Sequence, residues 1–180
     1  IDPAEIIAVG IDELSTRVLP VDRAGEPLLP GLIWMDRRAC RQAEWIAENL
    51  ADETWEIRGN VSDAGNIAPK IMWIRENEPE VYASTSVFLQ AKDYVIFRLS
   101  GRAVTDYSDA TGTNLFDVNT MEWSEEILRA AGIGKEKFPE AVSGDTVAGG
   151  ITAAAAGKCG LAEGTPVVVG GGDGACATYG

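Results

Sequence analysis

The glycine-rich segment that follows a run of valines constrains the fold of this chain more than any other stretch. Val167, Val168 and Val169 form an apolar run whose length and β-branched character predict a buried strand. Residues 170–172 are all glycine, which permits left-handed backbone and lets another molecule approach the main chain closely. Small residues at 175–177 suit the start of a packed helix. The sequence therefore predicts a strand, a tight glycine turn and a helix.

Asp173 lies at this junction, and its carboxylate has two interpretations. It is a candidate general base, because a carboxylate there can reach a substrate hydroxyl while the flanking backbone holds it still. It is equally a candidate helix cap, since Asp is among the preferred N-cap residues. The free N–H groups at the start of the helix also suit an anion or a developing negative charge. The local pattern leaves both roles open.

Net charge and composition limit the partners of this protein. Of its 180 residues, 46% are hydrophobic and 24% are charged, which is typical of a globular protein. Lys and Arg number 15 and Asp and Glu number 28, which gives a net charge of −13. This excess of negative charge argues against nucleic acid or an anionic membrane surface as the main partner. A small neutral ligand or a locally held anion is compatible with this charge. No apolar run approaches the roughly 20 residues of a membrane span.

Cysteine and histidine usage excludes several chemistries. Cys40, Cys159 and Cys176 are odd in number and are not spaced as metal ligands, so we expect reduced thiols, a cytoplasmic location and no metal site made by them. The chain contains no histidine. A Ser-His-Asp or Cys-His mechanism is therefore excluded.

The remaining pattern alternates strands and helices. Residues 6–11 predict a strand that is buried on both faces of a sheet with some parallel pairing, and the polar loop 12–16 follows at the strand end, where α/β proteins commonly bind ligands. A hairpin is expected over 17–34 with its turn at 22–25, and Pro27 and Pro30 should make its second arm an irregular edge. Segment 103–118 is expected to be mostly loop with short extended pieces. The expected helices cover 38–50, a segment from Pro69 that breaks at 77–79, 86–99 with a stop at Gly101, a segment from the cap Ser124 to Gly132, and 151–157.

Several stretches together resemble one family, in its order and spacing. They contain a W-x-D-x-R pattern at Trp34, Asp36 and Arg38 and the GGGD turn that ends at Asp173. The chain resembles the central part of the first domain of the FGGY carbohydrate kinases, and in particular their xylulokinase-like members. The matching stretches are 1–10, 22–38, 68–83, 93–101, 105–133 and 166–180.

The resemblance implies a fold and an activity. The fold would be α/β, namely a ribonuclease H-like (actin-like ATPase) domain with an inserted helical subregion. Family members use ATP and Mg²⁺ to phosphorylate a hydroxyl of an open-chain sugar or polyol, and the Asp of the GGGD turn, here Asp173, is their general base. The partner would be a small sugar or polyol, and the resemblance is compatible with a homodimer.

We interpret residues 1–180 as part of an N-terminal kinase domain, with the first phosphate-loop hairpin and the C-terminal ATP-binding domain outside them. Residues 1–180 alone are therefore expected neither to bind ATP tightly nor to turn over.

The resemblance also implies site residues, with one departure from the family pattern. By spacing, Ser15 and Thr16 occupy the positions of a Met-His pair in xylulokinase-like members. The loss of that pair argues against a ketopentose, and Asp12 or Glu13 could instead bind polyol hydroxyls. The sugar is expected between the 12–16 loop and the 170–173 turn. The further candidates are Asp36, Asn66 and Gly172 for the substrate and Gly170 and Gly171 for the cofactor.

Structural roles compete with some of these assignments. Asp36 could pair with Arg37 or Arg38 instead of lining a sugar pocket. Lys70 lies in a segment that approaches the substrate in relatives, but we expect it to be solvated at the start of a helix.

Two other functions remain open. One is a non-catalytic, kinase-like protein that binds sugar. The other is an oxidoreductase domain, because residues 172–177 also fit the G-x-G-x-x-A dinucleotide pattern after a strand.

Overall fold

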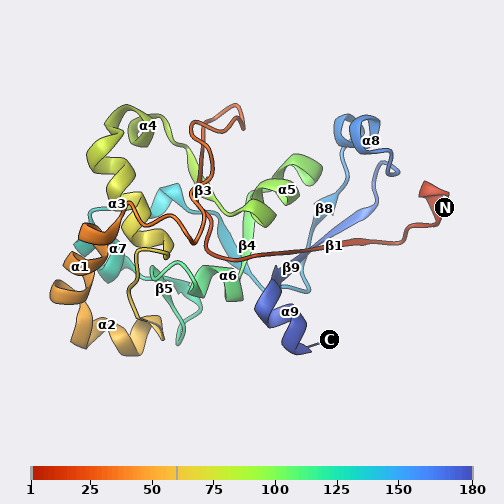
Figure 1. The fold of residues 1–180 in the computed structure, drawn as a ribbon. Helices are drawn as coiled ribbons and strands as arrows, with labels where there is room; N and C mark the ends of the chain where they lie inside the picture. Colours follow the sequence, from red (N-terminus) through yellow and green to blue (C-terminus); the bar gives the residue numbers. More distant parts are fainter. Residues whose placement is uncertain (1, 60, 180) are drawn as a thin grey trace.

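The strand at the glycine-rich junction is the centre of the largest sheet. The computed structural model describes residues 2–59 and 61–179. In it β9 (Pro166–Gly172) pairs in parallel with β1 (Val9–Glu13) and antiparallel with β8 (Val147–Gly150) (Figure 1). The predicted parallel pairing is therefore confirmed.

The other elements surround this sheet. The further strands are β2 (Leu19–Val21), β3 (Val87–Leu89), β4 (Val104–Asp106), β5 (Phe116–Asp117), β6 (Glu122–Trp123) and β7 (Glu140–Val142). They form three pairs, β2–β3 and β5–β6 antiparallel and β4–β7 parallel. The α-helices are α1 (Cys40–Asn49), α2 (Ala51–Arg58), α3 (Ile67–Asn77), α4 (Pro79–Ser84), α5 (Ala91–Ser100), α6 (Tyr107–Thr111), α7 (Glu125–Ala131), α8 (Ala153–Cys159) and α9 (Asp173–Tyr179). Two 3₁₀ turns cover Pro3–Glu5 and Lys135–Lys137.

The described residues bury two apolar clusters. The larger one joins α1, α3 and α7 to the β5–β6 pair, through residues such as Ile71 and Phe116. The smaller one lies where α5 and α8 pack on the sheet, through residues such as Ile96 and Val169. Figure 1 shows the helices α1 to α4 and α7 gathered at one end of the molecule and the β1-β9-β8 sheet with α8 at the other. The chain therefore has a mainly helical part beside the sheet.

The first strand differs from its predicted burial. Residues 6–11 were expected to be buried on both faces, but β1 begins at Val9 and alternates between half-buried and exposed residues. Ile7 is 89% exposed. β1 is the edge strand of the β1-β9-β8 sheet, and its register shifts between Gly10 and Asp12. The expectation was wrong because an apolar run does not reveal whether both faces of a strand find a packing partner.

The glycine-rich junction has the predicted order with one change. Strand β9 continues through Gly172, and α9 begins at Asp173, so the three glycines end the strand and no separate turn follows it. Gly170 has φ +74°, a left-handed conformation that glycine adopts without strain.

Local signals located most helix ends. The Ser124 hydroxyl accepts a hydrogen bond from Ile127 N–H at 3.3 Å and so caps α7, which ends at Gly132 with φ +66°. Gly101 ends α5 with φ +77°, and α3 ends at Asn77, just before Pro79. These predictions are confirmed, because caps and stops depend on residues that are adjacent in sequence.

Three local expectations were wrong or incomplete. Residues 87–89 are strand β3 and not the start of a helix, because they pair with β2. The loop expected at 103–118 contains helix α6, whose N-cap is Asp106. The 17–34 hairpin has the irregular second arm predicted from its prolines, but its pairing is reduced further, to two isolated bridges that join Val21 to Pro27 and Val18 to Leu32. Within the described ranges we find no helix of the length and apolarity needed to cross a membrane.

Candidate functional site

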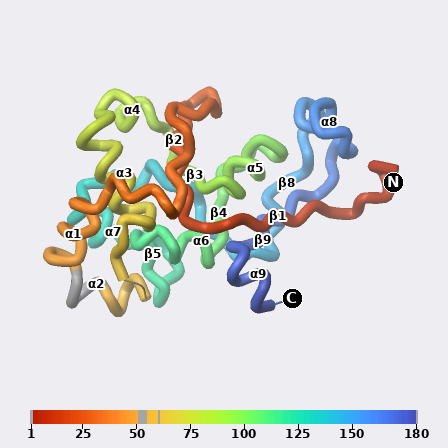
Figure 2. The backbone as a smooth tube through the Cα atoms, viewed as in Figure 1, coloured from red at the N-terminus to blue at the C-terminus, as the bar shows by residue number. Residues whose placement is uncertain are grey.

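The candidate site forms where β1 and β9 end side by side. Because the two strands are parallel, their carboxyl ends lie at the same edge of the sheet, where α/β proteins bind ligands. Asp12 is in register with Gly171 and Glu13 with Gly172. Figure 2 shows the start of the chain running alongside its end at this point. The fold therefore brings residues 12–16 next to the 170–173 segment, as predicted, although Asp12 and Glu13 are the last residues of β1 and not part of the loop.

Ser15 makes direct contact with the end of β9. Its hydroxyl donates a hydrogen bond to Asp109 Oδ1 at 2.6 Å. A Cβ atom added at Gly172 would overlap the Ser15 Oγ and would lie 3.0 Å from Asp109 Oδ1. The close approach of this loop is therefore one reason for a glycine at position 172.

Thr16 has an unusual backbone that its surroundings hold in place. Its φ is +64°, which is a true outlier for a β-branched residue. Its N–H donates to Gln90 Oε1 at 3.0 Å, and its carbonyl accepts from Lys70 Nζ at 3.4 Å. Strained residues that are fixed from several sides concentrate at binding and catalytic sites. This observation favours the loop as a ligand contact.

Lys70 is not solvated, contrary to expectation. It is 0% exposed, and its ammonium donates to the carbonyls of Gly65 and Thr16. Burial lowers the pKa of Lys70 to about 8, although the Asp36 and Asp63 carboxylates act in the opposite direction. The prediction was wrong because a position in the first turn of a helix does not reveal which loop covers it.

Asn66 lies in the same region, but its side chain is engaged within the protein. Its Oδ1 accepts from Asp63 N–H at 2.7 Å, and its Nδ2 donates to the Gly112 carbonyl at 3.4 Å. These bonds fix the loop before α3. A substrate contact from Asn66 stays a prediction.

Asp36 forms one of the structural pairs that were weighed against a sugar contact. Its carboxylate pairs with Arg38, whose Nη2 lies 2.8 Å from Asp36 Oδ2, while Arg37 pairs with Asp63. Hydrogen bonds from Arg38 hold the pKa of Asp36 below its ordinary value. Asp36 is therefore an ionised, paired carboxylate, and its contact with a sugar stays a prediction.

Asp12 and Glu13 have different environments. Asp12 is exposed, whereas both carboxyl oxygens of Glu13 are buried. Burial, together with repulsion from Asp109 and Asp93, raises the pKa of Glu13 to about 8, although the backbone N–H and the charge of Lys92 act in the opposite direction. Glu13 is therefore mostly protonated at neutral pH. Of the two, Asp12 is the one open to a ligand hydroxyl.

Glu13 should make the folded protein less stable as the pH rises. The pKa of Glu13 is about 8 in the folded state, against an ordinary value of 4.5. The free energy of unfolding therefore falls progressively as the pH rises from 4.5 to 8, and above pH 8 this loss is complete. Glu13→Gln should raise the free energy of unfolding at pH 8 by a few kcal/mol, at most about 5, and by little at pH 4. Urea denaturation at several pH values measures this. Exposed Glu48→Gln is the control, and equal pH profiles for the two variants would contradict the expectation.

The Asp173 carboxylate makes one hydrogen bond among the described residues, with Oδ1 accepting from the adjacent Gly174 N–H at 2.8 Å. An N-cap side chain accepts from the N–H of the second or third helical residue instead. Asp173 is itself the first residue of α9 and is half-buried. This geometry does not match a simple cap and leaves carboxylate oxygen available to a ligand.

An open hollow of about 590 Å³ lies beside β9 and α9. Its lining includes Gly170 and Gly171, which were assigned to the cofactor, together with Asp106, Ser108, Gly144, Asp145, Ala175, Cys176 and Tyr179. Two of these residues are acidic and none is Lys or Arg. The lining therefore does not by itself fit a bare triphosphate. The described residues also contain no cluster of acidic or Cys residues arranged to hold a metal, so we assign no Mg²⁺ ligand.

Sequence reasoning missed a buried charged cluster beneath the site. Lys92 lies among Asp93, Asp106 and Asp109, with its Nζ 3.0–3.3 Å from one oxygen of each. Two cap signals could have located these residues. Asp106 caps α6 through Ser108 N–H, and Asp93 completes a capping box with Gln90. No local signal indicates that Lys92 is buried.

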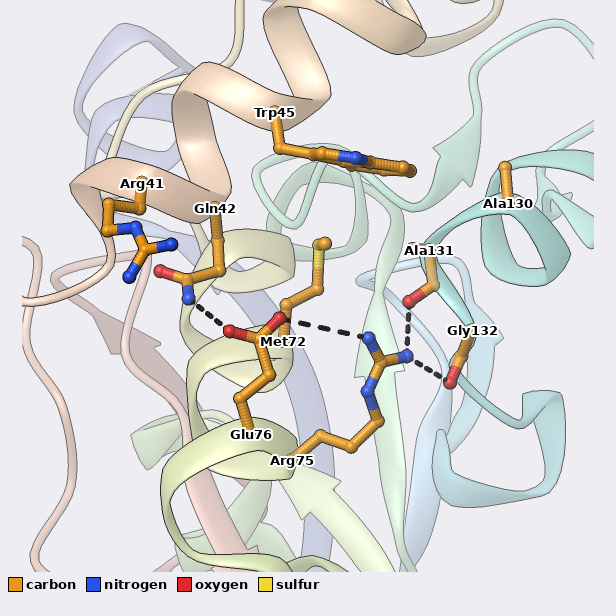
Figure 3. Close-up of a pocket in the computed structure, with 9 residues that line it drawn as sticks. All are labelled: Arg41, Gln42, Trp45, Met72, Arg75, Glu76, Ala130, Ala131 and Gly132. Atoms are coloured by element: carbon orange, nitrogen blue, oxygen red, sulfur yellow. Dashed lines mark hydrogen bonds and ion pairs between the residues drawn. The ribbon is translucent and has the colours of Figure 1, made fainter.

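A second hollow, of about 340 Å³, lies between α1, α3 and the end of α7 (Figure 3). The Trp45 ring forms one side, and Arg75 lies opposite, bound to Glu76 and to the last carbonyls of α7. None of the predicted site residues lines it. It is therefore separate from the candidate site.

Arg75 should stabilise the fold by capping α7. Its Nη1 donates to the carbonyls of Ala131 and Gly132, each at 2.6 Å, where the helix dipole also favours a cation. Arg75→Ala should lower the free energy of unfolding by ~1–3 kcal/mol in urea denaturation. Arg129→Ala, which removes an exposed cation from the same helix end, is the control and should cost only a few tenths of a kcal/mol. Equal losses for both would contradict the capping role.

Comparison with known proteins identifies relatives of the whole chain. Residues 1–180 match the family described as FGGY family of carbohydrate kinases, N-terminal domain. A xylulose kinase of Bacillus subtilis (strain 168) is 37% identical over 160 residues, which cover 89% of this chain and 32% of that protein. A glycerol kinase of Thermococcus onnurineus (strain NA1) is 31% identical over 144 residues, or 78% of this chain and 29% of that protein. The chain thus spans about a third of the length of these relatives.

A solved structure agrees with this family match. A crystal structure of xylulose kinase from Rhodospirillum rubrum superposes with a TM-score of 0.90 and 25% identity, covering 96% of this chain and 36% of that one. The expected α/β, ribonuclease H-like (actin-like ATPase) fold is therefore confirmed. The dinucleotide-binding interpretation of residues 172–177 is replaced by the match of the entire chain. Residues 1–180 belong to the FGGY family of carbohydrate kinases.

Proposed function

We propose that the protein phosphorylates a hydroxyl of an open-chain sugar or polyol with ATP, and that Asp173 is the general base. The observation that carries this proposal is the meeting of the 12–16 loop with the 170–173 segment at the ends of β1 and β9. These segments lie some 160 residues apart in sequence, and they come together next to a carboxylate whose one hydrogen bond among the described residues is to Gly174. The family match supports the reaction class.

Asp173 would act on the sugar hydroxyl. As the hydroxyl oxygen bonds to the γ-phosphorus of ATP, its proton passes to an oxygen of Asp173, and the bond from the γ-phosphorus to the bridging oxygen breaks with its electron pair leaving on ADP. Most of the acceleration of phosphoryl transfer comes from positioning and charge stabilisation. The fixed end of β9 would supply the positioning on the sugar side.

The loop would contact the other end of the substrate. The Ser15 hydroxyl donates its hydrogen bond to Asp109, so its oxygen is left to accept a hydrogen bond from a sugar hydroxyl. Exposed Asp12 could accept another. Ser15 and Thr16 stand where the xylulokinase-like pattern has Met and His, and relatives of similar identity are named xylulose kinase and glycerol kinase. We therefore propose a small polyol or ketose and leave its length open.

Mg²⁺, when bound with ATP, would neutralise phosphate charge. The hollow beside Gly170 and Gly171 is the region of this chain where we propose that the nucleotide approaches. A cytoplasmic location and a homodimer likewise stay proposals. Cys40, Cys159 and Cys176 are all free, as the reducing compartment would require.

A substrate screen tests the function. The full-length protein would be incubated with ATP, Mg²⁺ and a panel of ketoses, polyols and aldonates, and ADP release and the mass of the product would be measured. We expect turnover with at least one polyol or ketose. Saturable sugar binding without ADP release would contradict the enzyme proposal and favour the non-catalytic sugar-binding alternative.

A further inference from the structure

Lys92 is the centre of the buried charged cluster beneath the candidate site. It lies in the first turn of α5, and the residue is 1% exposed. Its ammonium lies 3.3 Å from Asp93 Oδ1, 3.0 Å from Asp106 Oδ1 and 3.3 Å from Asp109 Oδ2. A cation in the first turn of a helix opposes the helix dipole, and burying it costs several kcal/mol before pairing. The net gain in stability from such a buried ion pair is small or absent, so stability alone does not explain why a lysine occupies this position.

Two chains of hydrogen bonds, here called arms, extend from the cluster, and the first ends at the residue before Asp173. Asp106 Oδ1 faces Lys92, while its Oδ2 accepts hydrogen bonds from both the N–H and the hydroxyl of Ser108. The Ser108 Oγ in turn accepts from Gly172 N–H at 3.0 Å. Gly172 directly precedes Asp173. The orientation of Asp106 therefore fixes the last residue of β9 before the proposed base.

The other arm leads to the substrate loop. Asp109 Oδ2 faces Lys92, while its Oδ1 accepts from the Ser15 hydroxyl. The main-chain carbonyl of Asp109 accepts from Gln90 Nε2 at 2.9 Å, and Gln90 also holds the N–H of Thr16. The two arms thus reach the two walls of the site.

The ammonium is the charged partner of both arms. Asp106 Oδ1 and Asp109 Oδ2 are buried, and apart from the Lys92 ammonium they have no polar partner among the described residues. Burial opposes ionisation of Asp106, but Lys92 and Ser108 hold its pKa below the ordinary value. Burial raises the pKa of Asp109 to about 7, even though Lys92 lowers it. Without the ammonium, both carboxylates would be uncompensated in a buried site.

We propose that Lys92 is a positioning residue for phosphoryl transfer, which holds Asp106 and Asp109 so that the Ser15 loop and Asp173 keep their relative geometry. This inference rests on the proposed function. Lys92 does not contact the substrate. It acts through the two aspartates and the serines that they orient.

Lys92→Met removes the charge and keeps the length of the side chain. In the full-length enzyme it should lower kcat by about 100-fold, the scale expected for misplaced catalytic groups, while KM changes by less than about threefold. Amide hydrogen exchange at Gly172 reports the link to Ser108 and should become at least about tenfold faster. A folded variant with normal kcat and normal exchange at Gly172 would overturn the proposal.

Lys137→Met is the matched control. Lys137 is a half-buried lysine that donates to the carbonyls of Thr85 and Tyr82, away from the cluster. It should lower stability without changing kcat or the exchange at Gly172. If it changes both as much as Lys92→Met does at equal loss of stability, the effect of Lys92 is merely structural and the proposal fails.

Where Lys92→Met does not fold, the double variant Lys92→Met/Asp109→Asn replaces it, because it removes one positive and one negative charge together. We expect the same loss of kcat and the same faster exchange at Gly172, and normal values of both would again overturn the proposal. The exchange measurement also separates the two proposals. A wild-type protein that phosphorylates no sugar defeats the proposed function. Exchange at Gly172 in the variants then decides by itself whether Lys92 holds the end of β9.

Discussion

Asp173→Asn should lower kcat by ~10²–10⁴-fold while sugar affinity stays within about threefold of the wild-type value. The amide cannot accept the hydroxyl proton, and it carries no negative charge. It retains an oxygen that accepts from Gly174 N–H, which is the hydrogen bond that the carboxylate makes. The substitution therefore removes the chemistry with little change in local structure.

Steady-state kinetics and sugar titration of the full-length protein measure this effect. Glu163→Gln is the control, because it removes one negative charge at an exposed position just before the start of β9. Its kcat should equal that of the wild type. If Asp173→Asn keeps near-normal kcat, Asp173 is not the base. If it loses sugar binding and turnover equally, its role is in binding the substrate.

Sequence signals that act over a few residues predicted much of the fold. Ser124, Gly101 and Gly132 located helix ends, because capping depends on adjacent residues. The strand at β9 and a helix after the glycines were likewise predicted, although α9 begins at Asp173 and not at the small residues 175–177. The resemblance then brought together the two segments of the candidate site, which no local pattern could do.

Features set by distant partners were missed. Residues 87–89 are a strand because β2 lies beside them, and β1 is half-exposed because it is an edge strand. Lys70 and Lys92 are buried by segments remote in sequence, and a lysine in the first turn of a helix ordinarily indicates a solvated position. Burial of charge is therefore the property of this site that the sequence did not predict.

Gly170→Ala should destabilise the fold severely. Gly170 has φ +74°, and a Cβ atom there would overlap the carbonyl oxygen of Ile11 and lie 2.8 Å from its carbonyl carbon. These atoms belong to the backbone of β1, so they cannot move without breaking the pairing of β1 with β9. The left-handed conformation costs ~1–2 kcal/mol for alanine and the overlap ~1–3 kcal/mol, which is a large part of the stability of a typical domain.

Gly160→Ala separates these two contributions. Gly160 has φ +76°, but a Cβ atom there would have no neighbour within 4 Å. It should therefore cost only the ~1–2 kcal/mol of the left-handed conformation. Urea denaturation of both variants gives the difference, which we assign to the approach of β1.

The same comparison tests why position 170 is glycine. It was assigned to the cofactor, but the backbone of β1 supplies a sufficient structural reason for the missing side chain. If Gly170→Ala loses no more stability than Gly160→Ala and instead weakens ATP binding, the phosphate interpretation is correct and the approach of Ile11 is unimportant. If it loses the larger amount, the glycine is needed to hold β1 against β9, and through that pairing it keeps the 12–16 loop beside Asp173.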